Sequence, residues 1–194
     1  MGNELTRTAI HEAGHAVACV RLFPSRVSDN VSIEPDHEEM SLGRHASEEL
    51  RVSVHTSDNQ ADVIFLAEAT YCCAGYAALL AAGHSKAQAL FGCDQDFDEA
   101  GSFLEAGKQD AVELMRRPEN LRAVELIAKE LLQRKRLNGD HVAVLIDFSD
   151  GETTAEEYRA YLGLLGDAPG VRLKPKGSMR QPLESAQGSK SRFF

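Results

Sequence analysis

The apolar residues of the first 165 positions recur mostly at intervals of three and four, which is the spacing of one face of an α-helix. Two capping boxes, Ser57 with Gln60 and Thr154 with Glu157, mark helix starts. Gly83 follows the second apolar stretch and is typical of a helix end. This pattern predicts helices over residues 4–22, 57–82, 94–116, 121–137, 140–147 and 154–165.

Two short stretches lack the helical spacing and read instead as β-strands. Residues 31–34 and 42–47 are separated by Pro35 and a polar segment, which predicts a hairpin or a small sheet directly after the first helix. The expected fold class is therefore mainly α (α+β), a helical domain with a small β-hairpin or sheet beside its first helix.

The last 29 residues differ from the rest of the chain in charge and composition. Residues 166–194 carry six basic and two acidic side chains, three prolines and several glycines and serines, with no apolar period. Such a composition is typical of a poorly ordered extension. We therefore expect one domain over residues 1–165 and a basic Pro/Gly/Ser-rich tail over 166–194.

Charge and composition exclude several classes of partner. Asp and Glu number 30 against 21 Lys and Arg, a formal net charge of −9 that repels a phosphate backbone, so no nucleic acid partner is expected. The chain begins without a signal-peptide pattern, and its apolar runs are far shorter than the ~20 residues of a membrane span. Four cysteines without a C-x-x-C pair indicate reduced, mostly buried thiols. We expect a cytoplasmic protein with no membrane segment in this chain.

The first predicted helix contains the sequence His11-Glu12-Ala13-Gly14-His15. Two histidines four positions apart project from one face of a helix and can grip one metal ion, and neutral imidazole suits zinc. Glu12, beside His11, can act as general base for a zinc-activated water. The plain alternative is two histidines on a solvated helix face, but the apolar residues around the motif argue for a buried helix.

Gly14 adds to the case for a metal centre. A glycine inside a helix costs about 1 kcal/mol relative to alanine and therefore needs a structural reason. The close approach of another backbone to the metal-binding turn would supply that reason.

A third ligand must come from a distant segment, and residues 92–99 offer three aspartates. Asp94 is expected to be the N-cap of the next helix, so Asp96, inside that helix, is free to face the metal, and Asp94 and Asp98 stay open as further candidates. A calcium loop is disfavoured because Glu99 stands where its sharp turn requires glycine. The other histidines lack metal spacing and are expected at the surface or in loops: His37, His45, His55, His84 and His141.

The sequence His-Glu-Ala-Gly-His-Ala-Val, followed about 80 residues later by Gly-x-x-x-Asp-Phe, resembles the peptidase domain of FtsH-type zinc metalloproteases. More weakly, the two predicted strands and residues 131–139 resemble that family's hairpin and its Leu-Leu-Glu to Leu-Asp-Gly segment. The resemblance implies zinc (Zn²⁺) on His11, His15 and Asp96, with Glu12 as the catalytic base. It also implies that substrate backbone adds to the edge of the sheet, and it allows a homo-oligomer.

The chain departs from the family at several positions. Tyr76 replaces an arginine, Ala78 stands near an expected acidic residue, and Gln95 replaces an asparagine before the zinc aspartate. The family's membrane helices and ATPase module are not expected within these 194 residues. Residues 101–109 do not fit a phosphate loop, because Gln109 stands where Ser or Thr must hold magnesium. We therefore expect activity without ATP, on peptides or on segments that are already unfolded, unless a separate ATPase partner presents substrates.

The functional prediction is an ATP-independent zinc metalloendopeptidase, a hydrolase acting on peptide or unfolded protein substrates. The alternative from another class is a non-catalytic, zinc-stabilised interaction domain derived from such a peptidase, and a third is a helical scaffold that binds no metal. The presence of Glu12 favours the enzyme, because a purely structural metal site has no use for a base.

Overall fold

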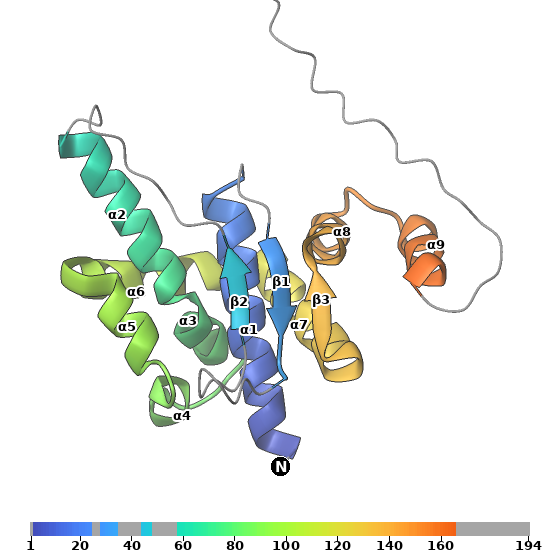
Figure 1. The fold of residues 1–194 in the computed structure, drawn as a ribbon, viewed down its shortest axis with the longest axis horizontal. Coiled ribbons are helices and arrows are strands. Elements are labelled where there is room, and N and C mark those ends of the chain that lie inside the picture. Colours follow the sequence, from blue (N-terminus) through green and yellow to red (C-terminus); the bar gives the residue numbers. More distant parts are fainter. Residues whose placement is uncertain (1, 25–27, 35–43, 48–57, 166–194) are drawn as a thin grey trace, which may run out of the picture.

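The structure is a computed structural model that describes residues 2–24, 28–34, 44–47 and 58–165. It confirms a mainly helical chain with a small antiparallel sheet (Figure 1). The strands are β1 (Ser28–Ser32), β2 (Arg44–Ser47) and β3 (Arg136–Asn138). The helices are α1 (Gly2–Leu22), α2 (Asp58–Cys72), α3 (Ala74–Ala81), α4 (Lys86–Leu90), α5 (Asp94–Ala100), α6 (Leu104–Met115), α7 (Pro118–Arg134), α8 (Gly139–Asp150) and α9 (Ala155–Leu165), with a 3-10 turn, η1 (Gly101–Phe103).

Helix α1 runs through the middle of the molecule, with α2 to α6 on one side and α7 to α9 on the other (Figure 1). It packs mainly against α3 and α7. Small and branched apolar side chains make this packing close: Ala9, Ala13, Ala16 and Val17 have no exposed surface. The helix that carries the histidine motif is therefore a core element, as its apolar flanks predict.

The sheet has the order β2-β1-β3, and β1 pairs antiparallel with both neighbours. Val31 at its centre lies opposite His45 on β2 and Leu137 on β3. Val31 and Leu137 are both buried and anchor the sheet on the helical core. Strand β1 begins at Ser28, three residues before the predicted start, and β3 is absent from the sequence prediction.

The predicted helix over residues 121–137 is wrong in its last turn. Lys135 adopts a left-handed conformation, with φ at 70°, and its backbone N–H donates to the carbonyl of Leu131. This closes α7 at Arg134 and turns the next three residues into the extended strand that completes the sheet. Asn138 then caps α8 by accepting a hydrogen bond from the N–H of His141 at 2.9 Å.

Two long helices of the prediction are each interrupted in the structure, so the prediction of a continuous helix is wrong for both. The predicted helix over residues 57–82 breaks at Cys73 into α2 and α3, whose axes differ by 50°. The predicted helix over residues 94–116 breaks at Gly101, whose φ of 54° is left-handed. Helix α4, which the prediction lacks, starts with a capping box between Ser85 and Gln88.

Of the remaining predictions, one helix cap is confirmed and three features lie at least partly outside the described residues. The capping box of Thr154 and Glu157 is present at the start of α9, with hydrogen bonds of 3.0 and 3.2 Å. The Ser57 cap, part of the second predicted strand and the tail over 166–194 lie outside the described residues.

Within the described ranges, no single helix is both long and apolar enough to cross a bilayer. Residues 60–72 and 74–81 reach that length and composition only when they are taken together across their 50° bend.

A buried asparagine ties α1 to the α6–α7 corner. Asn120 is 1% exposed, donates from Nδ2 to the carbonyl of Leu114 at 2.8 Å, and accepts at Oδ1 from Nε of Arg21 at 2.8 Å. The same guanidinium donates to both carboxylate oxygens of Asp150 at 2.6 and 2.7 Å. The Arg21 side chain thus joins the C-terminal end of α1 to Asn120 on α7 and to Asp150 on α8.

We expect Asn120→Ala to lower the free energy of unfolding by about 1–3 kcal/mol, because a buried carbonyl and a guanidinium N–H each lose a partner. Urea unfolding followed by circular dichroism measures the change. Gln109→Ala, at an exposed position of α6, is the control and should change stability by less than about 0.5 kcal/mol. Equal effects in the two variants would contradict this role for Asn120.

Candidate metal centre

The structure brings together three side chains from two segments that lie more than 80 residues apart in the sequence. On α1, Nε2 of His11 lies 3.1 Å from Nε2 of His15. From α5, Oδ2 of Asp96 lies 3.1 Å from the first of these nitrogens and 3.5 Å from the second. Around a tetrahedral zinc ion with bonds of 2.0–2.1 Å, neighbouring donor atoms lie about 3.3 Å apart. The three atoms therefore have the mutual spacing of ligands to one ion.

The hydrogen bonding of His15 fixes which ring nitrogen faces the other donors. Nδ1 of His15 lies 3.0 Å from the backbone carbonyl of Tyr71 on α2. A carbonyl only accepts, so Nδ1 carries a hydrogen, and Nε2 is the ring nitrogen that faces His11 and Asp96. This carbonyl is the kind of outer partner that orients a metal-binding imidazole.

Two glycines allow α3 to lie directly against the histidine motif. A Cβ at Gly14 would meet the carbonyl oxygen of Ala74 at 2.6 Å and the Cβ of Ala78 at 2.7 Å. A Cβ at Gly75 would meet the Cε1 and Nδ1 atoms of the His11 ring at 2.5 Å. The close backbone approach predicted at Gly14 is therefore confirmed, and Gly75 gives the His11 ring its space.

We expect Gly14→Ala to destabilise the chain by about 1–3 kcal/mol, because the new methyl group must displace the backbone of α3. The gain of about 1 kcal/mol in helix propensity acts in the opposite direction and is too small to offset the clash. Gly163→Ala on α9 is the matched control, since nothing lies within 4 Å of its added Cβ. Thermal unfolding should show the two substitutions shifting Tm in opposite directions, and a stabilised Gly14→Ala would contradict the packing.

Glu12 is a buried carboxyl group on the helix that carries His11 and His15. It is 6% exposed, and burial raises its pKa, while the nearby His11 and His15 partly offset that rise. A carboxylate with a raised pKa takes up a proton more readily at neutral pH than an exposed one. The position of Glu12 therefore suits a proton carrier.

Asp96 carries a permanent negative charge at the centre of the cluster. Burial alone would raise its pKa, but His15 and His11 hold the pKa of Asp96 well below its usual range. Burial by itself would lower the pKa of His15. The neighbouring Asp96 carboxylate has the opposite and larger effect, so the pKa of His15 is raised. The carboxylate is thus ionised at neutral pH, which is the form that binds a cation.

The structure distinguishes between the three candidate aspartates. Asp94 and Asp98 are exposed, whereas Asp96 is the one that reaches the histidines. The prediction that Asp94 is the N-cap is wrong by one residue, because α5 begins at Asp94 and Cys93 holds the cap position. Asp94 and Asp96 both lie in the first turn, where a negative charge is favoured by the helix dipole.

Two of the departures from the peptidase pattern have packing explanations. Tyr76 is buried and packs edge-on against Phe97 of α5, with ring centroids 5.7 Å apart. Ala78 has no exposed surface and lies directly beneath Gly14. Both side chains hold α3 against the helices that carry the donor atoms.

Cys93 is a neighbour of the site that the sequence analysis missed. Its Sγ, a ring nitrogen of His11 and a carboxylate oxygen of Asp96 all lie within 4.8 Å of one another. Burial, with Asp96 and Asp94, raises the pKa of Cys93 to about 12. The sequence contains one sign of this proximity. Cys93 stands three residues before Asp96, a spacing that places two side chains on the same face of a helix.

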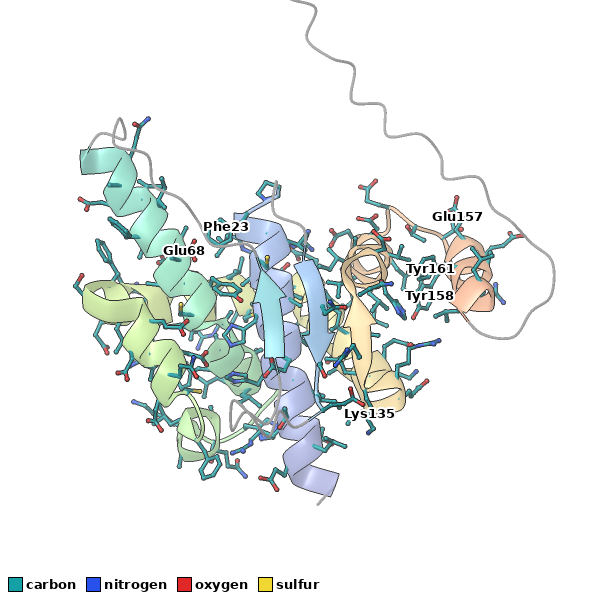
Figure 2. All side chains as sticks on the ribbon, viewed as in Figure 1. Phe23, Glu68, Lys135, Glu157, Tyr158 and Tyr161 are labelled. Carbon is teal, nitrogen blue, oxygen red and sulfur yellow. The ribbon has the colours of Figure 1, made fainter. Side chains whose placement is uncertain are left out.

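His141 is also misplaced by the sequence analysis, which puts it at the surface. It is 3% exposed on α8, and its ring lies 5.4 Å from that of Tyr161. Figure 2 labels Tyr161 on α9, between that helix and α8. Its Nε2 is 3.8 Å from Glu130, and burial lowers its pKa. His141 belongs to the packing between α7, α8 and α9 and not to the metal centre.

The chain matches no protein-family model and no curated protein. The chemistry of the site therefore follows from its own geometry, with three converging donors and a buried carboxylate on the same helix. Two imidazoles and a carboxylate that converge in this way are a donor set that could hold a divalent metal ion.

Proposed function

We propose that this protein is a zinc-dependent, ATP-independent metallopeptidase of the cytoplasm that hydrolyses peptide bonds in peptides or unfolded segments. The observation that carries the proposal is the convergence of His11, His15 and Asp96 at 3.1–3.5 Å, with Glu12 buried on the same helix as the two histidines. The resemblance to the FtsH-type peptidase motif gives the same four residues the same roles.

In this proposal His11, His15 and Asp96 hold Zn²⁺, and the ion supplies Lewis-acid polarisation of water and of the peptide carbonyl when it is bound. Glu12 accepts the proton of the attacking water and later delivers it to the leaving amine. Its burial supports both steps, because the raised pKa stabilises the protonated state between them. The carbonyl of Tyr71 keeps the His15 ring in the required orientation throughout.

The sheet offers a place for an extended substrate. The order β2-β1-β3 leaves β2 paired on one side only among the described strands, and β2 packs against α1. An extended peptide can add to such an edge through backbone hydrogen bonds, which select for unfolded chain rather than for a strict sequence. This supports peptides and unfolded segments as the substrate class.

A non-catalytic, zinc-stabilised interaction domain is the second candidate, and one observation favours it. Cys93 places a further donor within 4.8 Å of donor atoms of His11 and Asp96, and four protein ligands are typical of structural zinc sites. The two candidates differ in what they require of Glu12.

Chelator-sensitive cleavage of casein by the zinc-loaded protein tests the proposal. Cleavage that stops with chelator and returns with zinc is the expected result. A zinc-loaded chain that leaves casein and short peptides intact would favour the interaction domain.

A further inference from the structure

The thiol of Cys93 is placed to act on the metal centre, although the proposed mechanism gives it no role. Cys93 has no exposed surface and caps α5, and Asp96 follows it by three residues on the same helix. Its Sγ lies within 4.8 Å of donor atoms of both His11 and Asp96. A buried sulfur in this position faces the same space as the proposed zinc ligands.

The hydrogen bond of the thiol leaves its lone pairs available. Sγ of Cys93 donates to the carbonyl of Ala89 on α4 at 3.1 Å. The S–H bond therefore points toward the carbonyl of Ala89 on α4. A thiol that binds zinc loses its proton to solvent as the sulfur–metal bond forms, and the link to Ala89 is given up at the same time.

The spacing indicates a ligand that can be displaced. Donors around a tetrahedral zinc, with bonds of 2.3 Å to sulfur and about 2.0 Å to nitrogen, lie roughly 3.5 Å apart. Sγ lies up to 4.8 Å from the donor atoms of His11 and Asp96, so the Cys93 side chain must rotate toward them to reach the distance of a ligand. The same rotation in reverse returns the sulfur to Ala89.

We propose that Cys93 is a displaceable fourth ligand, which rests on zinc in the idle protein and leaves when substrate and water enter. The inference rests on the proposed metallopeptidase function. It gives the site four protein donors at rest and three during turnover, and it favours thiophilic ions such as zinc, cobalt and cadmium over magnesium and calcium.

The test is cobalt substitution of the full chain, with Cys93→Ala, Cys93→Ser and a matched control. Cys73→Ser is the control, because Cys73 is equally buried and its Sγ also contacts a backbone carbonyl, that of Leu104 at 3.9 Å. Bound cobalt is counted by elemental analysis, and sulfur ligation is read from the intense sulfur-to-cobalt charge-transfer absorption in the near ultraviolet. Peptidase rates are measured on the zinc-loaded forms of the same proteins.

We expect one cobalt per chain in all four proteins, with the charge-transfer band in the wild type and Cys73→Ser and no band in the two Cys93 variants. The zinc-loaded Cys93→Ala should cleave peptides several-fold faster than the wild type. Bound cobalt without the band in the wild type would overturn the role of Cys93 and leave the metallopeptidase standing. Unchanged rates in Cys93→Ala would overturn the displacement, and a chain that binds no cobalt would overturn both proposals.

Discussion

Glu12→Gln is expected to lower kcat/KM for casein cleavage by about 10²–10⁴-fold, the range over which a positioned acid–base group acts. The amide keeps the size and shape of the carboxylate but takes up no proton at neutral pH. Because Glu12 is 6% exposed, solvent cannot easily replace it at this position. The three donor atoms are untouched by the substitution, so zinc content should remain one per chain.

Glu4→Gln is the matched control for this experiment, since Glu4 lies on the same helix and is exposed. It should leave kcat/KM and zinc content unchanged. Activity of Glu12→Gln within a few-fold of the wild type would refute the proposed base. Loss of zinc together with activity would instead mean that Glu12 supports the metal centre.

Asp96→Asn is expected to weaken zinc affinity by more than about 100-fold, because it removes a direct ligand, whereas outer partners already contribute 10–100-fold. The amide is neutral, so the site also loses the charge that His11 and His15 keep on Asp96. Zinc at 100 times its Kd stabilises a protein that binds it only when folded by about 2.7 kcal/mol, and Asp96→Asn should lose this increment.

Competition with a chromophoric chelator measures the affinity, and thermal unfolding with and without zinc measures the stabilisation. Asp94→Asn and Asp98→Asn are the controls, because both residues are exposed on the same short helix. They should bind zinc like the wild type. Equal losses in all three variants would indicate a diffuse acidic patch rather than a ligand at Asp96.

Local sequence was sufficient to predict helix α1 and the close approach of another backbone segment at Gly14. The positions of His11 and His15 on one face follow from helix geometry alone, and the cost of a helical glycine pointed to the close contact with Ala74. The choice of Asp96 depended on the family resemblance. From the residues alone, Asp94 and Asp98 remained open, because the face that each presents depends on the start of α5, and the N-cap is Cys93 rather than the expected Asp94.

The predictions of secondary structure and burial fail where tertiary packing, and not local sequence, determines the conformation of the backbone. The apolar spacing of residues 64–81 continues through Cys73, so the pattern contains no sign of the 50° bend between α2 and α3. Strand β3 forms because Lys135 ends α7 in a left-handed turn and β1 accepts residues 136–138 as a partner. Burial of His141 depends on α9 covering α8, a contact that no local pattern reports.

The most direct measurement is an anomalous difference map at the zinc absorption edge, from crystals of the zinc-loaded chain. We predict one zinc peak per chain, about 2.0–2.2 Å from Nε2 of His11, Nε2 of His15 and a carboxylate oxygen of Asp96. A map with no peak between α1 and α5, or with a peak that any of these three side chains does not reach, would contradict the account.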